Sequence, residues 1–388
     1  MLRIRNSHNK ENVWGETDEQ QKSNLEVDLE GQEQISVYLK DERAIQELVN
    51  KSIRKAFVKM GIIVCILTLV VVVFVQFALP DIVSYFYYNP GKEIGENSNQ
   101  ISRDMAVYTE LTIPTYVRDD IRVEAKGYGK YDISIYQDVS YNGTFTNIAG
   151  KIEKGKITFY DMNSLKRPTS NLFAWYQMHG DTSKSLTQLI AEEKENFCVA
   201  GDTQMATEAL NQLNEKEMYV AYVTLDKMMS YEEFMKFISN KDGLISTWCA
   251  VVTNGQEQDK SINSMFRADN IGFQCNLTSS TQLTWDKDKY PKLRLWGEED
   301  KDIDALEQKM KTETFMKTHF VSMLKYMSQQ EKFLEMMDES PEKFSNAADY
   351  VENRGITVYG FAAMTDKETL LELNEMSQIY EIYTEPDK

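Results

Sequence analysis

Histidine, cysteine and proline are scarce in this chain of 388 residues. It has three histidines, four cysteines and seven prolines. Histidine is the side chain that most often serves as a general base near neutral pH, so three widely spaced histidines give catalysis little support. The cysteines form no Cys-x-x-Cys pair, which excludes the commonest zinc-binding spacing. These absences argue against both metal and acid–base chemistry.

Motifs for catalysis are lacking as well. The chain has no G-x-S-x-G, H-E-x-x-H or Walker-type phosphate loop. His319 falls on an amphipathic segment beside Phe320 and is predicted to be a structural side chain. His179 lies in the aromatic segment 175–181, which we interpret as a packed loop, with a ligand pocket as the alternative. We therefore predict that the protein is not an enzyme and uses no cofactor and no metal.

One stretch of the chain lacks charge entirely. Residues 60–79, MGIIVCILTLVVVVFVQFAL, contain only Thr68 and Gln76 as polar side chains. As a helix they would extend about 30 Å, which is the thickness of the hydrocarbon core of a bilayer. Four bases precede the run, whereas Asp81 is the first charge after it, and this bias predicts a cytoplasmic N-terminus. We expect a retained, single-pass transmembrane helix in the plasma membrane, with the C-terminal region outside the cytoplasm.

Acidic charge is concentrated after this apolar run. Residues 1–59 carry a net charge of −1 and the whole chain −18, which leaves −17 for the remainder. Such an exterior argues against binding nucleic acid and against anchoring on anionic lipid. We interpret it as a solvated acidic surface.

The cysteines outside the apolar run could be free thiols or could form a disulfide. Cys65 lies within the run, while Cys198, Cys249 and Cys275 follow it. An odd number allows at most one intramolecular disulfide there, and free buried thiols explain the pattern equally well.

The segment before the apolar run has a helical period. From an N-cap at Asp41, apolar side chains recur along one face, with acids in the first turns and bases in the last. The stripe comprises Ile45, Leu48, Val49, Ile53, Ala56 and Phe57. This helix should continue directly into the membrane, and its stripe should face lipid headgroups, a second copy of the chain or a cytoplasmic partner.

Beyond the membrane the pattern predicts an α+β fold. Period-two alternation indicates a β-rich, membrane-proximal region, after a tether whose aromatic residues 85–88 suit the membrane interface. Further on, residues 219–253 read as strand, capped helix and strand, and residues 356–383 repeat this order with a capping box at Thr365. Two such βαβ units predict a ferredoxin-like α+β sandwich. A long helix over 303–327 should lie between them, its methionines forming a plastic core rather than a metal or partner site.

The predicted organisation has four parts. They are a cytoplasmic tail with an amphipathic helix, a transmembrane helix, a β-rich extracytoplasmic region and a C-terminal α+β extracytoplasmic domain: 1–59, 60–79, 80–205 and 206–388.

The chain resembles the sigma factor regulators of Gram-positive bacteria, which are single-span membrane anti-sigma factors. The stretches that carry the resemblance are 50–55 leading into 60–79; 222–227, 230–238, 248–252 and 271–273; and 358–363, 367–373 and 379–383. The resemblance implies that the cytoplasmic segment sequesters an extracytoplasmic-function sigma factor while the exterior senses envelope conditions. The His-x-x-x-Cys-x-x-Cys zinc motif of many other anti-sigma factors is missing. Inhibition of the sigma factor would therefore have to use a metal-free helix.

Under this reading the partner-binding residues are Ile45, Leu48, Val49 and Ile53, because an amphipathic helix can occupy an apolar groove on the sigma factor. The alternative function is a membrane-anchored extracytoplasmic binding or envelope-assembly protein without sigma control. The extracytoplasmic ligand is not identified by the sequence.

Overall fold

The computed structural model describes residues 18–95, 98–139, 145–160, 173, 175–178, 197–200, 203–254, 265–266, 270–277, 283–296 and 302–386. The chain forms two compact units, Met1–Phe77 and Ala78–Lys388. His8 and His179 lie outside the described residues. The domain boundary predicted between residues 205 and 206 falls within the second unit and stays a prediction.

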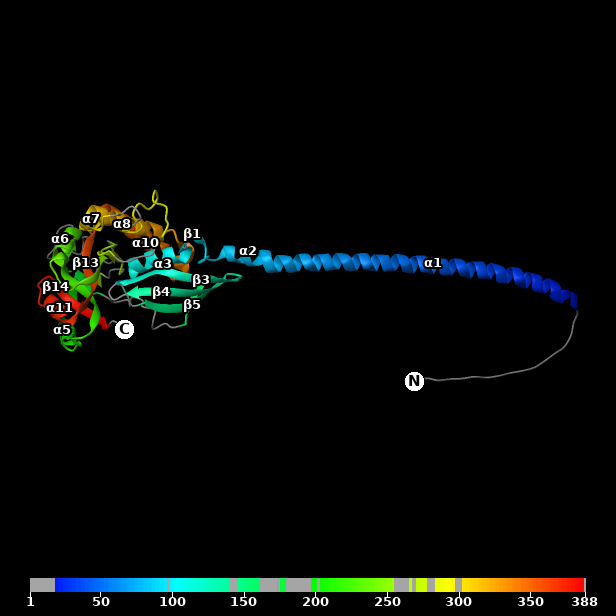
Figure 1. Cartoon of the computed structure of the whole chain (residues 1–388), viewed down its shortest axis with the longest axis horizontal. Coiled ribbons are helices and arrows are strands. Elements are labelled where there is room, and N and C mark those ends of the chain that lie inside the picture. Colours follow the sequence, from blue (N-terminus) through cyan, green and yellow to red (C-terminus); the bar gives the residue numbers. More distant parts are fainter. Residues whose placement is uncertain are drawn as a thin grey trace. The chain divides into compact units, whose positions relative to one another are not determined.

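The first unit is dominated by one helix, α1 (Asp18–Val73), which is followed by a π-helical turn, η1 (Phe74–Ala78) (Figure 1). The predicted continuation of the amphipathic helix into the apolar run is confirmed. Its start at Asp41 is wrong, because the helix begins at Asp18. Residues 18–40 are rich in Glu, Gln, Lys and Leu and contain no proline, so helix propensity carries the helix further back. By length and composition, the helical segment Lys40–Phe86 is able to cross a membrane.

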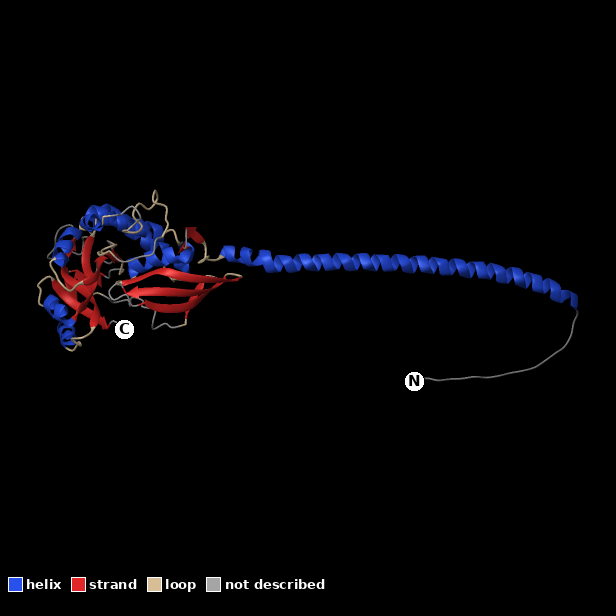
Figure 2. Ribbon diagram, viewed as in Figure 1, coloured by secondary structure: helices blue, strands red, loops and turns tan. Residues whose placement is uncertain are grey.

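The second unit mixes helices and strands (Figure 2). Its elements up to residue 211 are α2 (Leu79–Phe86), β1 (Glu93–Gly95), β2 (Ser98–Asn99), α3 (Gln100–Thr112), β3 (Tyr116–Gly127), β4 (Lys130–Val139), β5 (Phe145–Glu153), β6 (Lys156–Phe159), β7 (Trp175–Met178), β8 (Phe197–Ala200) and α5 (Thr203–Asn211). Strands β3 to β6 form an antiparallel meander within the region that the alternation predicted to be β-rich.

Strands β3 and β4 are joined by a tight turn. Gly127, which ends β3, and the turn residues Tyr128 and Gly129 have φ values of 78°, 54° and 70°. Successive left-handed residues reverse the chain at once, and glycine adopts this conformation without steric cost.

The elements after residue 211 carry the predicted repeat. They are β9 (Met218–Ser230), α6 (Tyr231–Ser239), β10 (Ile245–Val251), β11 (Met265–Phe266), β12 (Gly272–Gln274), α7 (Ile303–Met310), α8 (Glu313–Met327), α9 (Glu331–Met336), α10 (Pro341–Arg354), β13 (Thr357–Asp366), α11 (Lys367–Asn374) and β14 (Ile379–Pro386). Five of the strands form one sheet in the order β12-β10-β13-β9-β14, with all neighbours antiparallel. The order β14-β9-β13-β10 is that of two interleaved βαβ units, so the predicted α+β fold with two βαβ units is confirmed.

Caps explain where the helices of the repeat begin. The capping box of α6 is present, with Ser230 and Glu233 bonding to each other's backbone N–H groups. The second cap differs from the prediction. Strand β13 runs through Asp366, so the carboxylate of Asp366, rather than Thr365, accepts from the N–H of Thr369 and opens α11.

The long helix expected over 303–327 is two helices. Thr312 has an extended backbone, with φ −100° and ψ 134°, and this separates α7 from α8. The methionines form part of the core as predicted: Met310, Met316, Met323, Met327, Met336 and Met337 are all buried.

Candidate functional site

The predicted partner-binding residues lie on one face of α1. Their exposed fractions are 60% for Ile45, 67% for Leu48, 49% for Val49 and 46% for Ile53. Spacings of three, four and eight residues bring them onto one stripe of the helix. Since apolar side chains cost free energy when they face water, the stripe is suited to an apolar partner surface.

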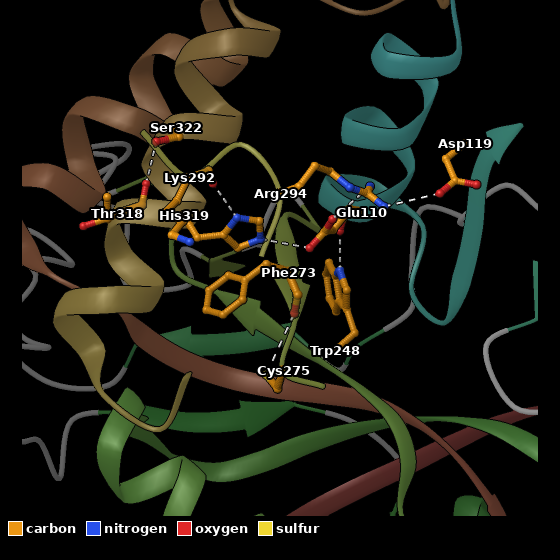
Figure 3. Close-up of polar contacts among 10 residues, drawn as sticks. All are labelled: Glu110, Asp119, Trp248, Phe273, Cys275, Lys292, Arg294, Thr318, His319 and Ser322. Carbon is orange, nitrogen blue, oxygen red and sulfur yellow. Dashed lines mark hydrogen bonds and ion pairs between the residues drawn. The ribbon is translucent and has the colours of Figure 1, made fainter. Parts of the chain in front are cut away.

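A second candidate is a polar centre buried in the unit Ala78–Lys388, where Glu110 of α3 meets His319 of α8 (Figure 3). The ring Nε2 of His319 lies 3.0 Å from Oε1 of Glu110, and Nδ1 lies 2.7 Å from the carbonyl oxygen of Lys292. His319 has no exposed surface. A carbonyl oxygen and a carboxylate both accept hydrogen bonds, so both ring nitrogens must carry hydrogens when both bonds form.

Arg294 brings a third charge into this centre. Its guanidinium lies 3.7 Å from the carboxylate of Glu110 and 3.4 Å from that of Asp119 in β3. Burial by itself raises the pKa of Glu110. The charge and hydrogen bond of His319, together with Arg294, outweigh burial and hold that pKa below its usual value of 4.5.

The polar centre also contacts the five-stranded sheet. The indole Nε1–H of Trp248 in β10 donates to the backbone carbonyl of Glu110 at 2.7 Å, and the ring of Phe273 packs edge-on against His319. One cluster thus ties α3, β3, α8 and the sheet together. Its geometry can hold these elements in one arrangement, because removing Glu110 would leave the buried ring of His319 without its carboxylate partner.

A third cluster surrounds Asp104, also on α3. Its carboxylate accepts from Tyr88 Oη at 2.6 Å, from Gln100 Nε2 at 2.8 Å and from Tyr326 Oη. Burial raises the pKa of Asp104 to about 6, although these hydrogen bonds and Arg103 act in the opposite direction. Tyr88 follows α2 by two residues, so the cluster fixes the segment that leaves the apolar helix to the core. The expected interfacial role of residues 85–88 is therefore corrected for Tyr88, which is buried.

Sequence reasoning predicted a structural role for His319, and the structure confirms its burial. It missed Glu110, Arg294 and Asp104. Glu110 and Asp104 lie on α3, in a region read as β-rich, and Glu110 and His319 are 209 positions apart. No local pattern joins residues so distant, so only their neighbours in the fold reveal the pairing.

Metal and disulfide chemistry find no support in the described part of the chain. No group of three or more potential ligands is found among its His, Cys, Asp and Glu side chains. Cys249 and Cys275 are buried free thiols, and Cys65 is free and exposed. Burial raises the pKa of Cys249, which keeps that thiol protonated and unreactive.

Comparison with known families gives one match. Residues 210–383, from the end of α5 to β14, match the family described as sigma factor regulator C-terminal. The region thus covers the whole ferredoxin-like repeat and the helices within it, and the resemblance predicted from the sequence is confirmed there. No curated protein and no solved structure gives a match.

Proposed function

We propose that this chain is a membrane-bound anti-sigma factor, because residues 210–383 match the sigma factor regulator C-terminal family. The family match is the observation that carries the proposal, and the apolar helix within Lys40–Phe86 supports attachment to the membrane. The N-terminal segment lies in the cytoplasm, because the bases at 51–59 are retained on that side.

The partner in this proposal is an extracytoplasmic-function sigma factor. Ile45, Leu48, Val49 and Ile53 enter an apolar groove on it and keep it from core RNA polymerase. Their exposure on one face of α1 supports this role, because a helix bound in a groove needs anchors at such spacings.

The exterior senses envelope conditions in this proposal. The Asp104 cluster supports a route for the signal. It fixes Tyr88 to α3 and α8, so that a rearrangement of those helices would move the segment leading to the apolar helix.

A reporter for the target promoter tests the proposal in the full chain. Leu48→Asp with Val49→Asp should derepress the promoter, because it removes apolar burial of about 2–4 kcal/mol in total. Asn50→Asp with Lys51→Gln is the matched control, since it makes the same charge change on adjacent residues outside the stripe.

Repression by the control should equal that of the native chain at equal membrane levels. If the Leu48/Val49 variant also represses fully, the stripe is not the binding element. If deletion of the whole gene leaves the promoter unchanged, sigma control is excluded in favour of an anchored extracytoplasmic binding or assembly protein.

A further inference from the structure

The short helix α2, which directly follows the apolar run, presents two different faces. Ile82, Tyr85 and Phe86 form one face and have exposed fractions of 45%, 80% and 69%. Pro80 and Ser84 lie on the other face, toward the β3–β4 turn. Three large apolar side chains are thus exposed next to the segment that leaves the membrane.

The β3–β4 turn lies against the beginning of α2. A Cβ atom added at Gly127 would lie 3.6 Å from Cβ of Pro80, and the N–H of Gly129 donates to Ser84 Oγ at 3.1 Å. Pro80 is the first residue after the uncharged run 60–79. Whatever touches Pro80 therefore lies at the level of the lipid headgroups.

The β5–β6 turn joins the same surface. The N–H of Lys154 donates to the carbonyl oxygen of Gly129 at 2.8 Å, which links the two turns. The ring of Tyr87 lies between them, within 3.1 Å of the Cβ position of Gly129 and 3.7 Å of that of Gly155. Both turns are thus fixed to the end of α2.

These two turns carry a local surplus of positive charge. Lys130, Lys154 and Lys156 are exposed, and no ion pair to them is found among the described residues. Three acids near the turns pair with other lysines: Glu124 and Asp132 pair with Lys126, and Glu153 pairs with Lys151.

We propose that this membrane-facing surface, formed by Lys130, Lys154, Lys156 and the exposed face of α2, binds anionic phospholipid headgroups of the bilayer that the chain spans. The surface combines lysines for the phosphates with aromatic side chains for the interface, at the level where both are present. The net charge of −17 on the exterior does not prevent this, because charges more than about 8 Å away are screened at physiological ionic strength. The docking holds the end of the span at a defined depth.

The full chain in lipid nanodiscs provides the test. Nanodiscs contain phosphatidylcholine alone or phosphatidylcholine with phosphatidylglycerol, and an amine-reactive ester modifies the lysines. Mass spectrometry then gives the rate at each site. Lys216 and Lys309 are exposed controls on other parts of the same unit.

Phosphatidylglycerol should slow modification of Lys130, Lys154 and Lys156 at least about threefold, and high salt should reverse the effect. Rates at Lys216 and Lys309 should not change. Equal rates at the turn lysines in both lipids would overturn the proposal, and so would equal slowing at the control lysines.

A set of variants provides a second measurement. Replacing Lys130, Lys154 and Lys156 by Gln should reduce the phosphatidylglycerol that copurifies with the chain, whereas replacing Lys216, Lys309 and Lys311 by Gln should not. Equal retention by both triple variants would also overturn the proposal. The inference rests on the membrane span but not on sigma factor binding, so either proposal can fail while the other stands.

Discussion

Asp104 shows how a single residue can link the membrane-proximal segment to pH. Its carboxyl group is fully buried, and its pKa is raised from 3.8 to about 6. Between these values the folded protein binds a proton that the unfolded chain has released. The contribution of Asp104 to stability is therefore greatest at low pH and falls as the pH rises through this window.

We predict that Asp104→Asn removes this pH dependence. In the native chain, the free energy of unfolding should fall by about 2 kcal/mol through Asp104 as the pH rises from about 4 to about 7. Glu110 acts in the opposite direction, because its pKa is held below 4.5 and its stabilising charge is lost as the pH falls from about 4.5, so the slope above about pH 5 reports Asp104. Urea unfolding in detergent micelles, followed by tryptophan fluorescence, measures the slope.

Asp349→Asn is the matched control, because Asp349 is exposed and lies on α10. It should keep the native slope. An unchanged slope in Asp104→Asn would mean that Asp104 does not titrate in this window.

At the scale of elements, local patterns predicted the strands and helices of the repeat but not all the others. Strand-like apolar runs and capping residues identified β9, α6, β10, β13, α11 and β14, because both signals are local, even though β9 and β13 are buried on both faces. Helix α3 was missed because four of the ten residues that it buries are polar, so its buried positions do not form an apolar period. The break at Thr312 was missed because the apolar period continues across it.

The sheet order predicts how a C-terminal truncation affects folding. Strand β13 lies between β10 and β9, so the second βαβ unit supplies the centre of the sheet. A chain that ends at Asn353 lacks β13, α11 and β14. Strands β9 and β10 would then lose their hydrogen-bonding neighbour and the apolar side chains of β13.

We expect residues 218–251 of that truncated chain to lose protection in hydrogen–deuterium exchange. A chain that ends at Pro386 keeps every strand and should be protected like the full chain. If the chain ending at Asn353 melts cooperatively and at the native temperature, the two βαβ units fold independently.

At the scale of the whole molecule, the proposed topology rests on charge and apolar length. The bases at 51–59 precede the run 60–79, and most of the acidic charge follows it. Bases are retained in the cytoplasm more strongly than acids are exported, so we propose that the basic flank sets a cytoplasmic N-terminus.

We predict that protease added to intact spheroplasts digests the unit Ala78–Lys388 and spares a tag at the N-terminus. Permeabilised cells, in which the tag should also be digested, provide the control. Loss of the tag in intact spheroplasts, with survival of the C-terminal unit, would reverse the proposed topology.

The sequence alone determined the apolar run, the helix that enters it and the repeat of strand, helix and strand. These features depend on residues close together in the chain, so composition and period are enough to find them. Only the tertiary structure decided that Glu110 meets His319, that Tyr88 is held by Asp104 and that lysines from two turns gather beside α2. Such groupings depend on contacts between distant segments, and a net charge of −18 averages over the local surpluses that folding creates.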